Sequence, residues 1–235
     1  MDKTTRNVRH QLFQFYLKEC RPPTVIELAT ECGLNTTEIH QILDRLEELH
    51  HIVQYKHQSR SPTPIAMAHP FSHLPTPFVV SQGSRRWWAN CVWCAFGLAA
   101  MLSPLKTTIS TRSGSIGTEL EFTIQDDQVT CMRHDGELDV DNCHCHFSIP
   151  PVKWWGDVRF ACTTIQIFAT KQEALEWPQK YGFYSGEIMT LKTLWLLSKA
   201  WYHDKHTYGY DRMTAEEVET LFNQLGMTSE FWKAR

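Results

Sequence analysis

Two cysteines spaced three positions apart are the residues of this chain best suited to chemistry. Cys91 and Cys94 lie in a tryptophan-rich segment, where an extended stretch gives way to an apolar run typical of a buried helix. Free N–H groups and the dipole at a helix N-terminus lower the pKa of a thiol, and the resulting thiolate is both a nucleophile and a soft-metal ligand. We therefore expect soft-metal or nucleophilic chemistry here. The alternative is two buried cysteines that pack as small apolar side chains.

A third cysteine stands later in the chain. Cys162 precedes an alternating apolar stretch, and this pattern predicts that the residue opens a strand. Taken alone, such a cysteine is typical of a protein core. It becomes a candidate for chemistry only if the fold brings it to the first pair.

A further group of metal-ligating side chains alternates cysteine and histidine from Cys143 to His146. On the strand expected there, alternate residues face opposite sides, so Cys143 and Cys145 would share one face. A zinc or copper site would then need Cys131 or His134 to complete it. The spacing is not a usual zinc pattern, and the alternative is a surface strand that binds no metal.

Residues 78–235 are expected to form an α+β core that positions these side chains. Alternating apolar stretches bounded by Gly or Asp predict strands, and capping residues followed by helical spacing predict helices. Together they indicate a mixed or mostly antiparallel sheet with flanking helices. The expected strands cover residues 78–81, 106–110, 119–124, 129–133 and 145–149, and the expected helices cover residues 91–102, 171–180, 187–202 and 215–225.

Residues 1–56 are expected to form a helical module that resembles a winged helix-turn-helix. Its second helix, within residues 36–51, carries four acidic side chains against one arginine, whereas a helix in the major groove should neutralise phosphates. We therefore expect a scaffold rather than a DNA-binding module. The boundaries come from a capping box, a glycine that ends a helix, a threonine cap and a short wing strand: Thr24–Glu27, Gly33, Thr36 or Thr37, and residues 52–55.

Residues 57–77 are expected to be an extended connector between these two regions. Prolines at positions 62, 64, 70, 75 and 77 are too dense for a helix or a central strand. His69 and His73 lie in this segment. Solvent exposure is the simpler expectation for both, and the alternative is a place at the mouth of a pocket.

The composition excludes several classes of partner. The chain of 235 residues carries 23 basic and 26 acidic side chains, so no global basic field favours nucleic acid or an anionic membrane surface. Its first residues are polar, unlike a signal peptide, and its longest apolar run is too short to cross a bilayer. We expect a cytoplasmic protein whose eight cysteines stay reduced.

The ordered set of these segments resembles the alkylmercury lyase family. An aromatic-rich segment with a Cys-x-x-[acid]-like motif before an apolar helix, and then a cysteine before a strand ending in Phe-Ala, match residues 87–102 and 154–177. Residues 191–202 fit the family's closing helix. The resemblance implies that Cys91 and Cys162 bind mercury and that Cys94 replaces the family's proton-delivering aspartate. It also implies an N-terminal module that does not act on DNA.

The reaction implied by the resemblance is protonolysis of a carbon–mercury bond. Two thiolates on mercury push electron density onto the carbon, an acid protonates that carbon, and a hydrocarbon leaves. Mercury is substrate and product, no organic cofactor is required, and a small thiol or a metal-accepting protein removes the metal. We expect the sulfurs of Cys91 and Cys162 to converge. Cys91 should ionise first, while Cys94 keeps its proton until it acts as the acid or as a third ligand.

Two other functions stay open at this point. A thiol at position 94 would hold a metal more tightly than a carboxylate, which favours a non-catalytic protein that binds Hg(II), Cu(I) or Zn(II). A metal-responsive regulator would instead use the N-terminal module on DNA, against the acidic charge of its second helix. A thioredoxin-like redox role is disfavoured, because no βαβ pattern precedes Cys91 and Cys94.

Overall fold

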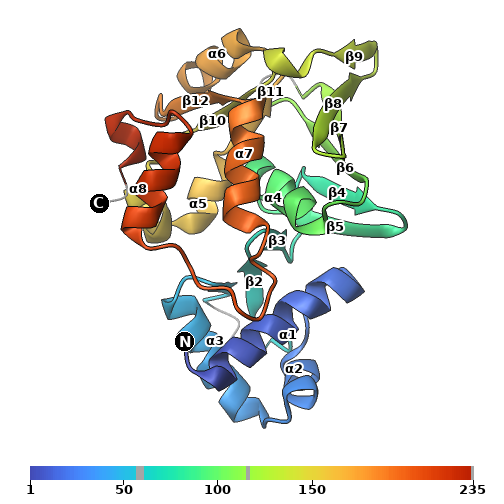
Figure 1. Cartoon of the computed structure of the whole chain (residues 1–235), viewed down its shortest axis with the longest axis vertical. Coiled ribbons are helices and arrows are strands. Elements are labelled where there is room, and N and C mark those ends of the chain that lie inside the picture. Colours follow the sequence, from blue (N-terminus) through green and yellow to red (C-terminus); the bar gives the residue numbers. More distant parts are fainter. Residues whose placement is uncertain (57–60, 115–116, 234–235) are drawn as a thin grey trace.

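The computed structural model describes residues 1–56, 61–114 and 117–233. Three helices form one end of the molecule, and a larger region of helices and strands forms the rest (Figure 1). Short strands β2 (Ile65–Ala68) and β3 (Phe71–Ser72) lie where the two regions meet. The helices are α1 (Lys3–Glu19), α2 (Val25–Cys32) and α3 (Thr36–Glu48).

The N-terminal helices begin and end where the sequence supplies caps. Thr24 and Glu27 form the expected capping box at α2, and Gly33 ends that helix with a φ of 66°, which glycine adopts without strain. The expected cap at Thr36 or Thr37 is wrong, because Asn35 caps α3 and its amide oxygen accepts the backbone N–H of Glu38 at 3.0 Å. The expected wing is the two-residue strand β1 (Val53–Gln54).

Most strands belong to one nine-stranded sheet in which every neighbouring pair is antiparallel. In β7 the buried residues Leu120, Phe122 and Ile124 alternate with more exposed ones, as expected for a sheet with one face on the core. The order is β1-β2-β3-β5-β4-β6-β7-β8-β9, with β4 (Val79–Gln82), β5 (Arg85–Ala89), β6 (Thr107–Arg112), β7 (Glu119–Gln125), β8 (Gln128–Arg133) and β9 (Gly136–Leu138).

The segment expected to be an extended connector is folded into this sheet. β2 and β3 both lie inside the strand order, and all four residues of β2 are buried, so the expectation that residues 61–77 hold no central strand is wrong. Residues 57–60 of that segment lie outside the described residues. The prolines are compatible with pairing because each stands between or beside the strands rather than within one.

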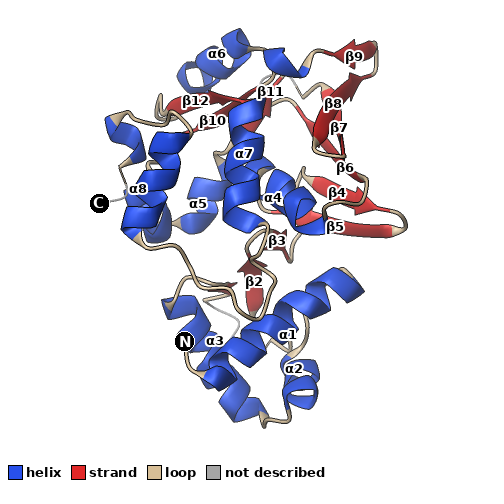
Figure 2. Ribbon diagram, viewed as in Figure 1, coloured by secondary structure: helices blue, strands red, loops and turns tan. Residues whose placement is uncertain are grey.

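A second, three-stranded sheet has the order β11-β10-β12, with β10 (His144–Phe147) antiparallel to both neighbours. β12 (Glu187–Thr190) takes the first four residues of the helix expected from position 187, because Thr190 caps α7 (Leu191–Tyr202). The antiparallel sheets and the helices around them confirm the expected α+β class (Figure 2). The other elements are β11 (Gln166–Phe168), α4 (Val92–Leu102), α5 (Val158–Thr163), α6 (Lys171–Tyr181), α8 (Ala215–Gln224) and the short 3-10 helices η1 (Val140–Asn142), η2 (Pro151–Gly156) and η3 (Glu230–Trp232).

Helices α4 and α7 lie side by side in the middle of the larger region. α4 packs on β4, β5 and β6 of the large sheet, and α7 packs on β10 and β12 of the small one. A Cβ at Gly97 would overlap the ring of Tyr202, so glycine on α4 lets the end of α7 approach closely. Across the described ranges, no helix combines the length and apolar composition needed to cross a membrane.

The N-terminal helices share a hydrophobic core with the larger region. Tyr16 of α1 stacks on Phe71 of β3 with ring centroids 4.7 Å apart. The indole N–H of Trp87 on β5 donates to the carbonyl of Tyr16 at 2.7 Å. These contacts fix the helical module against the sheet that leads to the cysteines.

Candidate active site

Three buried cysteines from two helices converge at one point. The sulfurs of Cys91, Cys94 and Cys162 all lie within 4.8 Å of one another, which confirms the expected approach of Cys91 and Cys162. In the part of the chain that the structure describes, they are the one group of three or more Cys, His, Asp or Glu side chains placed to hold a metal ion. Such a set of thiols suits a soft metal.

The first two thiols sit at the N-terminus of α4, as the sequence predicted. Cys91 is the N-cap of this helix, and its sulfur accepts the backbone N–H of Cys94 at 3.4 Å. Cys94 follows within the first turn, among apolar neighbours that bury the whole helix. The helix therefore holds both sulfurs in fixed positions beside its unpaired N–H groups.

Cys162 lies on a helix and does not open a strand. Asp157 caps the six-residue helix α5, and β11 begins only at Gln166. The alternating apolar residues that predicted a strand belong to the segment after the helix, and a helix this short leaves no periodic signal of its own. The turn of α5 directs the sulfur of Cys162 back towards α4.

The directions of the pKa shifts favour Cys94, rather than the Cys91 expected from the sequence, as the thiol that ionises first. Burial alone would raise the pKa of Cys94, but hydrogen bonds from Cys162 and Cys91, the nearby His69 and the hydroxyl of Tyr202 hold it well below its ordinary value. Burial raises the pKa of Cys91. A bond with Cys91 lowers the pKa of Cys162, but its bond with Cys94 and its burial outweigh this and raise it. Together these directions favour a thiolate at Cys94 between protonated thiols at Cys91 and Cys162, and the three sulfurs titrate as one interacting set.

Solvent exposure, the favoured expectation for His69, is wrong, and the alternative place beside a pocket is the one observed. His69 is buried, and its Nε2 lies 3.6 Å from the sulfur of Cys162. Burial lowers the pKa of His69 to about 4, so the imidazole is neutral at physiological pH. The expectation of solvent exposure followed from the interpretation of residues 57–77 as an extended connector. Instead, β2 and β3 belong to the sheet, and the turn between them carries His69 into the core.

Two polar side chains surround the sulfur of Cys94. The hydroxyl of Tyr202 lies 3.5 Å from it, and burial raises the pKa of this phenol, so the hydroxyl keeps a proton to donate. The amide of Asn90 donates to the carbonyls of Pro70 and Phe71 and lies 3.9 Å from the same sulfur. Both hold the thiolate in place and supply it with hydrogen-bond donors.

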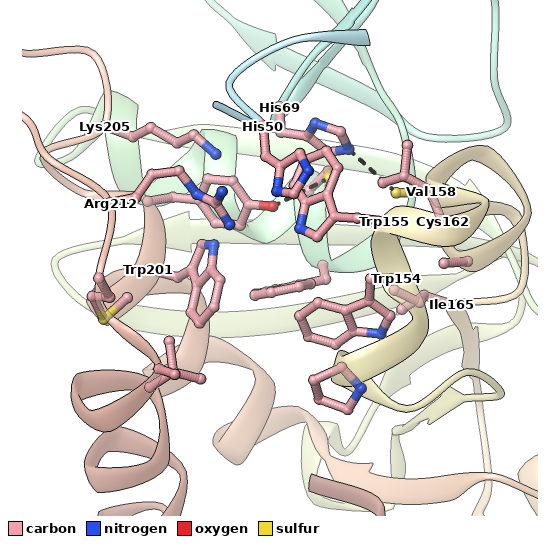
Figure 3. Close-up of a pocket in the computed structure, with 18 residues that line it drawn as sticks. His50, His69, Trp154, Trp155, Val158, Cys162, Ile165, Trp201, Lys205 and Arg212 are labelled. Atoms are coloured by element: carbon pink, nitrogen blue, oxygen red, sulfur yellow. Dashed lines mark hydrogen bonds between the residues drawn. The ribbon is translucent and has the colours of Figure 1, made fainter. Parts of the chain in front are cut away.

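A cavity of about 220 Å³ opens beside the thiols. Cys94 and Cys162 line it, whereas Cys91 lies behind them and is fully buried. In Figure 3, Lys205 and Arg212 approach the cavity from one side, and Trp154 and Cys162 from the other. Four tryptophans are among the residues that line it: Trp93, Trp154, Trp155 and Trp201.

The other cysteine and histidine group does not assemble in the same way. Within the described residues, Cys131, Cys143 and Cys145 join no group of three metal-ligating side chains, although Cys131 and Cys143 share a thiol hydrogen bond. His144 and His146 face backbone carbonyls, each at 2.8 Å. At this second location the structure brings together two thiols, those of Cys131 and Cys143, rather than a set of three or more metal ligands.

Comparison with known proteins decides the family. The family model described as MerB, alkylmercury lyase, matches residues 71–203, which is more than half of the chain and includes all three clustered cysteines. The chain belongs to the alkylmercury lyase family. A solved structure titled as the mercury-bound form of MerB2 matches this chain with a TM-score of 0.66 and 20% sequence identity, covering 88% of this chain and 93% of that one. No curated protein sequence matches the chain.

For this alkylmercury lyase family member, the two matches cover different parts of the site. The family model includes the cysteines and Tyr202 but ends before Lys205 and Arg212. The structural likeness extends over most of the chain and shows that the fold is shared. Side chains beyond the matched residues therefore have to be interpreted from their own surroundings.

Proposed function

We propose that this alkylmercury lyase family member cleaves a carbon–mercury bond by protonolysis, using Cys91, Cys94 and Cys162. The observation that carries the proposal is the meeting of three buried sulfurs at the wall of an aromatic cavity. Thiolates have a high affinity for Hg(II), and an apolar cavity suits the organic group bound to it.

Capture begins at the two sulfurs that face the cavity. An organomercury cation, R–Hg⁺, binds the sulfur of Cys162, and the thiol proton of Cys162 moves to the thiolate of Cys94, with which it shares a hydrogen bond. Cys91 then adds to mercury from behind. Exclusion of water by the surrounding indoles strengthens the interaction between the metal and the sulfurs.

Cleavage moves one proton to carbon. Cys94 gives up the proton it has received, the electron pair of the C–Hg bond stays with carbon, and R–H leaves. The proton of Cys91 replaces the one on Cys94 as Cys91 becomes a thiolate ligand. One proton has reached carbon, the other rests on Cys94, and Hg(II) is held by Cys91 and Cys162, so the charges balance.

Release completes the cycle without an organic cofactor. A small thiol or a metal-accepting protein exchanges with Cys91 and Cys162, returns a proton to each sulfur and carries the Hg(II) away, and Cys94 then loses its remaining proton to solvent. The third sulfur is the observation that favours a second candidate function, because three thiolates within 4.8 Å would retain the metal. In that case the protein is a binder that sequesters Hg(II), Cu(I) or Zn(II).

The experiment that separates these functions measures methane. Purified protein is incubated with methylmercury and an excess of a small thiol, and the gas above the solution is analysed over several turnovers. The lyase produces methane beyond one equivalent, and Cys162→Ala produces none. A wild-type protein that binds methylmercury and releases no methane is a binder, and the proposed lyase function is then wrong.

A further inference from the structure

Two cationic side chains line the cavity on the side opposite Cys162 (Figure 3). Lys205 follows α7 in a turn, is only 5% exposed, and places its ammonium 5.0 Å from the ring centre of Tyr202. Arg212 lies over the ring of Trp155 at 5.2 Å and donates to the carbonyl of Leu49 at 3.1 Å.

Lys205 is buried and Arg212 is half-buried, and neither has a carboxylate partner among the described residues. The nearby acids are engaged elsewhere, since Asp211 pairs with Arg6 and Asp204 lies beside His203. None of the ion pairs in the described ranges involves Lys205 or Arg212. Buried charges in proteins are normally paired with an opposite charge. Two cations without a carboxylate partner at a cavity wall are therefore suited to an incoming anion.

The electrostatic surroundings of Lys205 agree with this geometry. Burial, followed by Arg212 and Arg9, lowers the pKa of Lys205 to about 7, and the opposing influences come from the thiols Cys94 and Cys162. Mercury bound to these sulfurs would cancel their negative charge. An anion beside Lys205 would then be the group that stabilises the ammonium.

We propose that Lys205 and Arg212 form a subsite for a carboxylate that accompanies mercury into the cavity. The inference rests on the proposed function. The carboxylate belongs either to the organic group of the mercurial or to the small thiol that removes the metal. A cavity of roughly 150 Å³ holds benzene, so about 220 Å³ with indole walls accepts an aromatic ring bearing one small substituent. The favoured substrate class is an arylmercurial with a carboxylate on the ring.

The first test compares capture of 4-carboxyphenylmercury with capture of phenylmercury. Mercury bound beside Trp93 and Trp154 quenches tryptophan fluorescence, so the capture rate is measured without any bond cleavage. Because a hydrogen bond to a charged group is worth 1.5–3 kcal/mol, Lys205→Met should lower the ratio of the two capture rates by about tenfold. Lys205→Arg, which keeps the charge, should restore most of that ratio.

A matched control and a second variant guard against misfolding. Lys199→Met removes a lysine from the same helix region, but Lys199 pairs with Asp127 outside the cavity, so its capture ratio should equal that of the wild type. Arg212→Met should lower the ratio in the same direction as Lys205→Met. Circular dichroism and thermal unfolding of each variant show that the fold is intact.

The second arm identifies the source of the carboxylate. Removal of bound Hg(II) is timed with thioglycolate and with 2-mercaptoethanol, which differ in charge. The release ratio is the rate of Hg(II) removal by thioglycolate divided by the rate with 2-mercaptoethanol. If Lys205→Met lowers this ratio and leaves the capture ratio unchanged, the carboxylate belongs to the acceptor thiol. If neither ratio changes, or if both mercurials slow equally, Lys205 merely balances the thiolate and the subsite is wrong. Formation of benzene or benzoate is scored separately, so a failed lyase function is distinguished from a failed subsite.

Discussion

At position 94, the proposed reaction needs a group that accepts a proton and then gives it to carbon. A carboxylate has this capacity because its ordinary pKa is low, whereas a thiol gains it only where the surroundings favour the thiolate. The neighbouring thiols and the hydroxyl of Tyr202 provide such surroundings for Cys94. The cysteine can therefore replace the aspartate expected from the family, while differing from it in affinity for mercury.

The first residue-scale prediction follows from that difference. Cys94→Asp should retain methane production from methylmercury and speed the release of Hg(II), because a carboxylate is a harder ligand than a thiolate. Cys94→Ala should slow cleavage by about 10²–10⁴-fold, the usual contribution of a positioned acid or base. Capture by Cys91 and Cys162 should remain, as measured by bound mercury. Equal methane rates in wild type and Cys94→Ala would make Cys94 a bystander.

A second residue-scale prediction concerns the ionisation order. Because the pKa of Cys94 is lowered, its thiolate should persist as the pH falls below the ordinary thiol value of about 8.5. Ultraviolet titration of thiolate absorbance should show this signal in the wild type and lose it in Cys94→Ala. Tyr202→Phe should move the transition to higher pH, since a donor to the thiolate is removed. Loss of the signal in Cys91→Ala alone would reverse the assignment.

The residues found from the sequence are those with a spacing signal. Cys91 and Cys94 mark a helix N-terminus three positions apart, and the family resemblance adds Cys162. His69, Tyr202 and Lys205 had no such signal, because each reaches the site through a turn or a helix end whose direction depends on tertiary packing. The ionisation order also depended on a contact between α4 and α5 that no local pattern predicts.

At the scale of elements, the site depends on how closely α7 approaches α4. Gly97 faces the ring of Tyr202 with no room for a Cβ. This close approach brings the hydroxyl of Tyr202 within 3.5 Å of the sulfur of Cys94. A single small residue on one helix thus sets the hydrogen bonding of the thiolate.

We predict that Gly97→Ala destabilises the protein, although alanine is the better helix former. The added methyl group would force the Tyr202 ring away, and overpacking of this kind costs about 1–3 kcal/mol. Denaturant unfolding measures the loss, and the thiolate titration should shift to higher pH as the hydroxyl retreats. Gly209→Ala is the control, since a Cβ there meets nothing within 4 Å. Equal stability of both variants would contradict the packing argument.

The elements with strong local signals were predicted well, and those fixed by pairing were not. The capping residues Thr24, Thr170 and Thr214 act through nearby backbone groups, which a sequence displays directly. β2 and β3 are short strands whose partners lie elsewhere in the chain, so proline density concealed them. α5 was mistaken for the start of a strand because six residues contain too little periodicity.

For the molecule as a whole, the N-terminal helices and the larger region complete one cavity. His50, just after α3, lines it and stacks on Trp155 with ring centroids 4.1 Å apart. Arg9 of α1 donates to the backbone carbonyl of Lys205. These contacts support the interpretation of residues 1–56 as a module that covers the site.

The last prediction is that this module does not bind DNA. A recognition helix has to neutralise phosphates, yet the exposed residues of α3 include Glu38, Asp44 and Glu48, and its Arg45 is already paired with Glu48. The opposite face packs on the core through Leu43 and Leu46. A gel-shift titration with mixed-sequence duplex DNA at low salt should show no complex at micromolar protein. A complex that forms at submicromolar protein concentration and weakens steeply with added salt would show that the module contacts phosphates. That result would contradict the prediction, because the module would then bind DNA as well as cover the site.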